Sequence, residues 1–561
     1  MSEKIAQLAP EITLFIGTCV VMVVGLARSA SSRQACAVVT GFTLLIAGAL
    51  AVNGPTGSGL FPELLPYAKA TIALVGVLLT LVAAGTVDRK DEEEIAAGKR
   101  VFDPLRSNRG EFWAFFLFSL TGAMLCASAE DLIWLFLALE LTSLPTYVMV
   151  AISTSGNRSK ESGVKYFFLG ALGAAIFLYG FALLYGGTGS TRLPEIAAVV
   201  RGQIEAGGIS PIVMGGAILA LVGVSFKIAA VPMHFYTADV YQGAATPVTA
   251  FLAFVPKTAG FLAIMLIVGT LGWNSGPGGV GLPEPVRVLL WVMAGVTMTI
   301  GNTLAILQRS AKRVLAYSSI AHSGYMLVGI IAGPGSGTPT ENGLAAVLFY
   351  LMVYGVTSTG SFAVLACLER RVKHGEAVEI EDISDLRGLC QRDPWLGWTF
   401  VICVLSLLGF PPLVGFFAKV PLFTAGIAAG EIPLVIVLGL NSAIAAYYYL
   451  RLAGAAMLED PSDQTSDVVR HPAPMRAAAG PICAAGVLGL SVMGSTLLSA
   501  GTDASELARI EPMHRDAGGH DTTPAHEGHD AGDHGSHDSD HGHDAHGAVD
   551  SAGAPIADAR R

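Results

Sequence analysis

The sequence contains 561 residues, of which 52% are hydrophobic and 14% are charged, and its formal net charge is -10. Soluble domains average about 25% charged residues, so this composition excludes an ordinary soluble protein and indicates a chain whose solvent is lipid. Much of the acidic charge lies after residue 500 and in residues 91–94, and we expect no nucleic-acid partner.

Long apolar stretches recur along the chain, separated by short polar or Gly/Pro-rich joints. A helix needs about 20 apolar residues to cross a bilayer, so these stretches predict about fourteen transmembrane helices and an all-α polytopic membrane fold. The first stretch, Ile12 to Ala27, is interpreted as a retained helix rather than a signal peptide, because no small-residue cleavage site follows it. The predicted spans begin near residues 10, 34, 68, 111, 130, 161, 211, 246, 285, 312, 342, 396, 431 and 476.

Lysine and arginine gather in alternate joints. Arg28 and Arg33 follow the first span, the joint from Val52 to Tyr67 has none, and the next joint is again basic. Positive charge marks the cytoplasmic side of a membrane protein. With an even number of spans, both termini are expected outside the cytoplasm.

Proline interrupts two predicted spans. One contains Lys227 followed by Pro232, and the other contains Pro411 and Pro412 followed by Lys419. Proline removes a backbone donor and clashes with the preceding turn, so both spans are expected to be broken helices. Breaks at matching places suggest two inverted five-helix repeats. The expected division is three helices in residues 1–110, a first repeat in 111–271, a second repeat in 285–455, a last helix in 470–500 and a disordered His/Asp-rich tail in 501–561.

Four charged residues fall inside predicted spans: Glu140, Lys227, Lys257 and Lys419. A charge deep in a span costs at least about 2.5 kcal/mol, so each one needs a reason. A buried lysine that approaches or leaves a carboxylate can switch protonation near neutral pH. One carboxylate cannot neutralise three lysines, so the set predicts a proton-conducting chain. A static salt bridge or a lysine that snorkels to the interface is the alternative for any single residue.

Two histidines and one further lysine are weaker candidates. His234 follows the break at Pro232, and His322 lies in a predicted span; both titrate near neutrality and can relay protons, although a structural histidine is equally consistent with each. Lys165 lies near the cytoplasmic end of its span, where snorkelling is the preferred interpretation.

Cofactor and metal motifs are not convincing. The seven cysteines are scattered without a C-x-x-C pair, so neither an iron–sulfur cluster nor a disulfide framework is expected. The G-x-G-x-x-G motif at Gly276 to Gly281 follows a membrane span and contains a proline, which excludes a nucleotide site. Nine of the 13 histidines lie between His514 and His546, but without fixed ligand spacing we expect a solvated tail rather than a metal site.

Four segments, residues 138–145, 230–251, 317–325 and 409–419, resemble the N-subunit family of bacterial NADH-quinone oxidoreductase. The Asp-Val-Tyr-Gln-Gly run from Asp239 favours this family over the sibling L and M subunits. The resemblance covers about residues 5 to 500, and the His-rich tail departs from it.

The resemblance implies a fourteen-helix antiporter-like fold in the membrane arm of complex I, in the bacterial inner membrane, with both termini periplasmic and other membrane-arm subunits as partners in a hetero-oligomer. Glu140 would be the modulating carboxylate, Lys227 its pumping partner, Lys257 the central relay and Lys419 the lysine of the second half-channel. NADH, FMN, the iron–sulfur clusters and quinone would be bound by other subunits, with no cofactor in this chain.

Two other classes of protein remain open on the sequence. An Mrp-type cation/proton antiporter subunit, or the related subunit of a membrane-bound hydrogenase, shares the fold and the buried lysines. A membrane scaffold that only links pumping neighbours would need no titratable chain.

Overall fold

The computed structural model of the chain describes residues 2–57, 59–104, 107–154, 156–371, 377–461, 465, 467–471 and 473–507. Of the predicted tail, everything from residue 508 onward lies outside the described residues.

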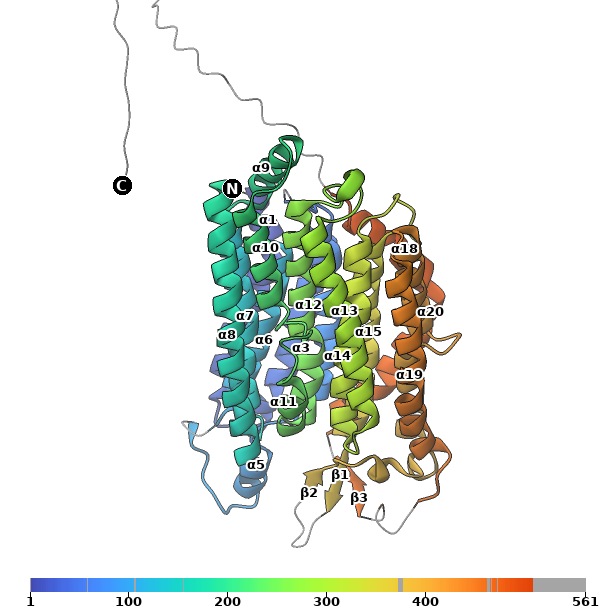
Figure 1. Cartoon of the computed structure of the whole chain (residues 1–561). Helices are drawn as coiled ribbons and strands as arrows, with labels where there is room; N and C mark the ends of the chain where they lie inside the picture. Colours follow the sequence, from blue (N-terminus) through green and yellow to red (C-terminus); the bar gives the residue numbers. More distant parts are fainter. Residues whose placement is uncertain are drawn as a thin grey trace, which may run out of the picture. The chain divides into compact units, whose positions relative to one another are not determined.

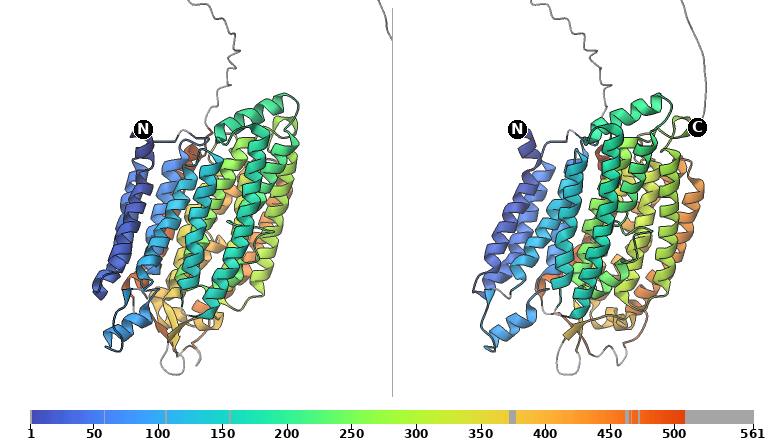
Figure 2. Two further views of the ribbon diagram at one scale, coloured as in Figure 1. Left: turned by 90° about the vertical axis from the view of Figure 1, so that its left-hand side faces the viewer. Right: turned by 60° about the vertical axis from the view of Figure 1, so that its left-hand side comes forward.

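The described chain is a bundle of long helices that lie side by side (Figures 1 and 2). Eleven of its helices are long and apolar enough to cross a bilayer, and four shorter apolar helices accompany them, which confirms the predicted all-α membrane fold. The eleven are α3 (Ala30–Val52), α4 (Leu64–Ala83), α6 (Arg109–Ala127), α7 (Leu132–Ile152), α8 (Asn157–Thr188), α12 (Thr246–Leu271), α13 (Glu284–Ile306), α14 (Ala311–Ala332), α15 (Gly343–Ala366), α19 (Ile432–Met457) and α20 (Pro474–Ala504). The shorter four are α2 (Ala9–Gly25), α10 (Pro211–Val224), α17 (Pro394–Leu408) and α18 (Val414–Ala428).

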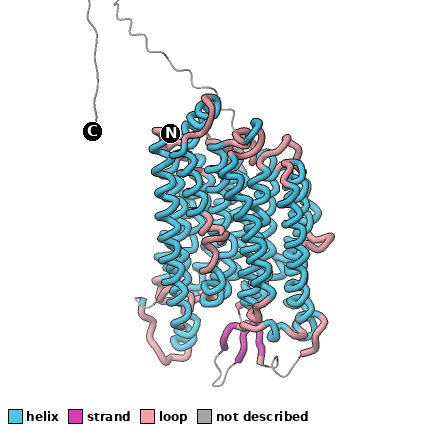
Figure 3. Tube along the Cα trace, in the orientation of Figure 1, coloured by secondary structure: helices cyan, strands magenta, loops and turns pink. Residues whose placement is uncertain are grey.

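Small elements cover the two ends of the bundle. One end carries α5 (Arg89–Ala96) and an antiparallel sheet in the order β2 (Ala377–Glu379), β1 (Leu368–Arg371), β3 (Val468–Arg470), and we call it the sheet-bearing face (Figure 1; strands magenta in Figure 3). The opposite end carries α1 (Ser2–Gln7) and α9 (Leu193–Glu205). The remaining short elements are α11 (Thr237–Gly243), η2 (Pro277–Gly279), η3 (Ile383–Leu386) and α16 (Leu389–Arg392).

Two spans are broken where prolines predicted it. Non-helical turns separate α10 from α11, and this loop lies within the bundle in Figure 3. The second break separates α17 from α18, so that these two helices together occupy the single span predicted from residue 396. The peptide bonds Val231–Pro232 and Pro411–Pro412, one in each break, are cis. A break leaves carbonyls of the preceding turn without intrahelical donors.

The first helices of the two expected halves run in opposite directions. α6 begins beside α5, since Arg109 lies 3.5 Å from Glu92, and α5 is itself tied to β1 by an ion pair of 2.7 Å between Arg89 and Glu369. α13 instead ends on this face, since Ser310 just after it pairs with Asp382 beyond β2. Opposite directions are what an inverted repeat requires.

The middle of the bundle is formed by α12, α14 and α15. The most apolar windows of α12 and α15 are wholly buried and that of α14 is nearly so, whereas α8 and α20 expose most of theirs. Polar side chains on the three central helices are therefore shielded from lipid by the protein itself.

Candidate functional site

Glu140 and Lys227 form an ion pair between α7 and the first broken span. Lys227 Nζ donates to Glu140 Oε1 at 3.0 Å and to Ser143 Oγ at 2.6 Å. The lysine side chain is 1% exposed and the glutamate 17%. A buried cation needs a partner of this kind, and the pair places the two residues of the predicted switch in direct contact.

Lys257 lies on α12 at the centre of the bundle and is bound by neutral oxygen atoms. Its Nζ donates to the carbonyls of Ile228 and Ser319, both at 2.9 Å, and to Ser323 Oγ at 2.6 Å. The carbonyl of Ile228 is available because the helix is broken there. Lys257 is 1% exposed, and none of these three ligands is a carboxylate.

His322 lies on α14 between the serines that contact Lys257. Its Nδ1 is 2.6 Å from the Tyr350 hydroxyl of α15, and its Nε2 is 2.7 Å from the Tyr449 hydroxyl of α19. Tyr449 also bonds Ser318 Oγ. An imidazole bonded on both ring nitrogens can accept a proton on one side and release one on the other.

Lys419 lies on α18 beside the second break. Its Nζ donates to the carbonyl of Leu408 at 2.7 Å, at the C-terminus of α17, where the helix dipole favours a cation. The ammonium also lies 5.2 Å from the centre of the Tyr325 ring. Each break thus supplies a freed carbonyl to one buried lysine.

The predicted residues follow one another across the bundle. Lys257 is bonded to the residue next to Lys227, and its other ligands, Ser319 and Ser323, lie on either side of His322. The His322 and Tyr325 rings are 5.4 Å apart between centroids, and Tyr325 faces Lys419. The structure therefore brings together five of the seven candidates, in the order Glu140, Lys227, Lys257, His322 and Lys419, and we call this series the line.

His234 and Lys165 lie apart from this line. His234 Nδ1 is buried but has no hydrogen-bond partner within the described part of the chain. Lys165 lies on the surface of α8, 48% exposed, and pairs with Glu161 one helical turn away at 2.6 Å. The position of Lys165 agrees with the snorkelling interpretation.

Polar groups that the sequence did not suggest are also buried. Lys69 of α4 pairs with Glu11 of α2 at 2.8 Å and donates to the Gln7 carbonyl at 2.7 Å. In the second half, Asn302 donates to the Tyr325 hydroxyl at 2.9 Å and accepts from Tyr448 at 2.9 Å. Asn302 thereby fixes the ring that faces Lys419.

Gly409 makes room for Lys419 in the second break. Its φ is +84°, and a Cβ added there would lie 2.9 Å from Cδ and 3.3 Å from Nζ of Lys419. Gly409→Ala should therefore displace the ammonium and lower proton transfer by up to about a hundredfold, as a misplacement near 1 Å can. The measurement is proton uptake by vesicles that contain the assembled complex.

Gly430→Ala is the matched control, because Gly430 has a similar φ of +76° and nothing within 4 Å of an added Cβ. Both variants should lose about 1–3 kcal/mol of stability from backbone strain. Equal proton transfer in the two variants would show that Gly409 does not position Lys419.

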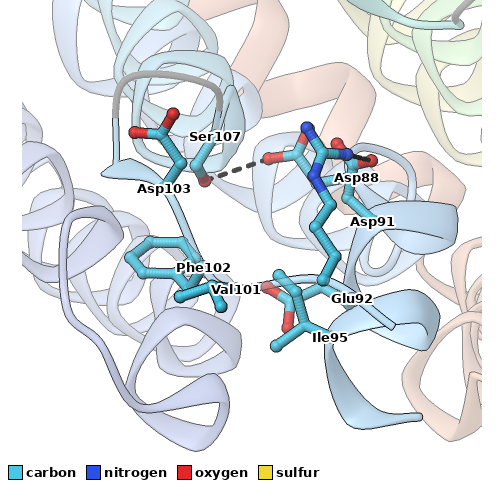
Figure 4. A pocket seen from close by; sticks show the side chains of 9 residues that line it. Asp88, Asp91, Glu92, Ile95, Val101, Phe102, Asp103 and Ser107 are labelled. Atoms are coloured by element: carbon cyan, nitrogen blue, oxygen red, sulfur yellow. Dashed lines mark hydrogen bonds and ion pairs between the residues drawn. The ribbon is translucent and has the colours of Figure 1, made fainter. Parts of the chain in front are cut away.

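A separate pocket of about 280 Å³ lies on the sheet-bearing face beside α5 (Figure 4). Its carboxylates are engaged: Asp88 accepts from Asn108 N at 2.7 Å, Asp91 pairs with Arg100, and Glu92 is bonded by the buried Arg33. We interpret these contacts as structural, because they attach the chain just before α6 to the rest of the bundle. Within the described ranges there is no cluster of three residues able to hold a metal ion.

Comparisons of the sequence with known proteins agree on one family of membrane proteins. Residues 129–445 match the family model described as NADH:quinone oxidoreductase/Mrp antiporter, TM. NADH-quinone oxidoreductase subunit N 1 of Rhizobium meliloti is 36% identical over 515 residues, which cover 89% of this chain and 96% of that protein. Subunit N 2 of Symbiobacterium thermophilum is 40% identical over 362 residues, covering 63% of this chain and 68% of that one.

Solved structures give the same fold. A chain of respiratory complex I from Thermus thermophilus with bound aureothin is 30% identical, with a TM-score of 0.68 over 87% of this chain and 98% of that one. A chain of the Mrp complex from Dietzia sp. DQ12-45-1b is 20% identical, with a TM-score of 0.69 over 90% of this chain and 97% of that one. The latter likeness concerns the fold alone.

Proposed function

The chain belongs to the NADH:quinone oxidoreductase/Mrp antiporter transmembrane family, and we propose that it moves protons across the membrane as the N subunit of an NADH:quinone oxidoreductase. Quinone reduction elsewhere in the complex would drive this movement. NADH, FMN, the iron–sulfur clusters and quinone are expected on other subunits.

The observation that carries this proposal is the environment of Lys257. Its ammonium is buried at the centre of the bundle and is held by two carbonyls and a hydroxyl, none of which neutralises its charge. Burial among neutral ligands favours the neutral amine, while three acceptors favour the ammonium, so both protonation states are accessible. A lysine with two accessible states can accept a proton from one side and pass it to the other.

The ion pair between Glu140 and Lys227 controls when a proton reaches Lys257. While Lys227 is paired with Glu140, its ammonium is stabilised; when the carboxylate is neutralised or drawn away, the unpaired cation releases its proton toward Lys257. The acceptor is the Lys257 amine, so one N–H bond breaks and one forms. The same exchange then continues through His322 to Lys419.

The position of Glu140 fits a subunit with a membrane neighbour. Along α7 it lies between Leu137 and Leu144, which are 60% and 50% exposed and mark the outward face of the helix. A carboxylate on a lipid-facing stripe is costly, so a partner subunit would cover it. We place the sheet-bearing face, with its Arg33, Arg109 and Lys312, on the cytoplasmic side of the bacterial inner membrane.

Purification of the full chain from membranes in mild detergent tests the proposal. We expect it to co-purify with companion subunits and with NADH:quinone oxidoreductase activity. Recovery of a sodium-extruding complex without redox centres would replace the proposal with an Mrp-type antiporter, whose fold this chain shares.

A further inference from the structure

A short segment that begins at the last residue of β2 crosses the sheet-bearing face, and we call residues 379–383 the strap. Its Glu379 contacts α12 and α14, and its Glu381 accepts from Arg158 of α8 at 2.7 Å and from Gln242 of α11 at 2.9 Å. The strap also pairs with the start of α14, since Ala311 N donates to the Glu381 carbonyl at 2.9 Å. Four helices that surround the first break are thus joined by one loop.

Glu379 attaches the strap to the bundle, with 25% of its side chain exposed. It accepts from Thr246 N at 3.1 Å and Thr246 Oγ1 at 2.7 Å, at the N-terminus of α12, and it pairs with Lys312 Nζ at 2.5 Å. Lys312 is 5% exposed and donates also to the Ala244 carbonyl at 3.3 Å, at the end of α11. The ion pair therefore joins a buried lysine to a carboxylate that water can still reach.

The charges around Glu379 keep this contact formed at neutral pH. Burial raises the pKa of Glu379, but Lys312 and Thr246 lower it by more, so its pKa lies below the usual carboxyl value. Arg476 of α20 also lowers the pKa of Glu379, and Glu379 in turn acts on His471 after β3.

Two helices lead from this ion pair to Lys257. On α12, Thr246 and Lys257 are 11 residues apart; on α14, Lys312 and Ser323 are also 11 residues apart. Eleven residues are three turns, so each pair lies on one face of its helix, roughly 16 Å apart along the axis. Both helices begin on the sheet-bearing face. Glu379 and Lys312 therefore lie at the outer ends of α12 and α14, and Lys257 lies three turns further into the bundle.

Three hydroxyl groups, those of Tyr241, Ser319 and Tyr354, come together part of the way between the ion pair and Lys257, and we call them the hydroxyl row. Ser319, two turns beyond Lys312 on α14, is flanked by the hydroxyls of Tyr241 of α11 and Tyr354 of α15. Its own Oγ is buried without a direct partner in the described part of the chain, while its carbonyl accepts from Lys257. Hydroxyls both donate and accept, so a row of them can pass a proton.

We propose that Glu379 passes protons between water at the sheet-bearing face and Lys257, and that its ion pair with Lys312 closes this route. This inference rests on the proposed function. The carboxylate takes a proton from water, loses its attraction for Lys312, and the strap opens; the proton then leaves for the hydroxyl row, Glu379 is ionised again and the pair closes.

The test is Glu379→Gln in the assembled complex. Glutamine keeps an oxygen that can accept from Thr246, so the N-terminus of α12 stays capped. Unlike a carboxylate, its amide cannot take up a proton near neutral pH. Lys312 loses its counter-ion, so we expect some loss of stability. In the complex that still assembles, protons moved through this chain should fall at least about a hundredfold, at the lower end of what a positioned proton carrier contributes. Glu381→Gln, in the same strap, is the matched control and should pump normally.

Lys257→Met, measured in parallel, separates this inference from the proposed function. If Lys257→Met removes this chain's share of proton movement and Glu379→Gln does not, Glu379 is only a helix cap and the inference is wrong. If neither variant changes it, the proposed function itself is wrong. A pumping defect in Glu381→Gln equal to that in Glu379→Gln would also overturn the inference, since it would mean that strap attachment alone matters.

Discussion

Glu140→Gln and Lys227→Met are each expected to lower proton transfer through this chain by about two to four orders of magnitude. That is the range a positioned proton-transfer group contributes, and the two side chains are bonded at 3.0 Å with the lysine 1% exposed. Each variant removes one member of the pair that controls the switch. The measurement is proton movement into vesicles containing the purified complex during NADH oxidation.

The buried pair of Glu11 and Lys69 is the matched control for this result. It has the same chemistry, a distance of 2.8 Å and nearly complete burial, but it lies in the N-terminal helices away from the line. Glu11→Gln and Lys69→Met should lower stability, since each leaves a buried partner unpaired, without changing protons moved per electron. If both sets of variants pump normally, or both fail alike, the Glu140 pair is a static salt bridge.

Lys257→Met is expected to interrupt the line at its centre. Methionine fills nearly the same volume, so α12 should pack as before, but the two carbonyls and the Ser323 hydroxyl lose their shared donor. Protons delivered to Lys227 then have no acceptor, and transfer to His322 should fall at least about a hundredfold. Dye-monitored acidification of vesicles reports this loss.

Lys69→Met again provides the comparison, because it removes a lysine that is 2% exposed but has a carboxylate partner. If Lys257 relays protons, the two variants differ in proton transfer even where they are similar in stability. Normal acidification by Lys257→Met vesicles would mean that protons bypass α12.

The positions of the spans could be predicted closely from hydropathy. The predicted starts near 211 and 246 coincide with α10 and α12, whereas those near 34 and 161 lie four residues inside α3 and α8. Both of these helices begin with polar residues such as Arg33 and Lys160, which extend beyond the apolar core of a membrane and do not register as hydrophobic.

The broken spans and their lysines were predictable for a physical reason. Proline at positions 232, 411 and 412 cannot continue a helix, and a lysine in lipid needs oxygen ligands. What the sequence did not show is that the breaks themselves supply those ligands, Ile228 O for Lys257 and Leu408 O for Lys419. Backbone carbonyls carry no sequence signal, so this pairing required the fold.

Other parts of the site depend on tertiary contacts with no local pattern. Glu11 lies at the start of a span, where an acidic residue is ordinary, so its pair with Lys69 was missed. Glu379 lies in a strand of three residues, too short for an alternating pattern to mark. The fixed orientation of Tyr325 by Asn302 depends on α13 and α14 packing together. The roles assigned to the line and the division into two repeats remain predictions.

The most direct test of the central claim is the number of protons moved per NADH oxidised, measured in vesicles with the native complex and with the Lys257→Met complex. If the line from Glu140 to Lys419 carries protons, this ratio falls in the variant by the share that this chain contributes, while the Lys69→Met complex keeps the native ratio. An unchanged ratio in an assembled, NADH-oxidising Lys257→Met complex would contradict the account.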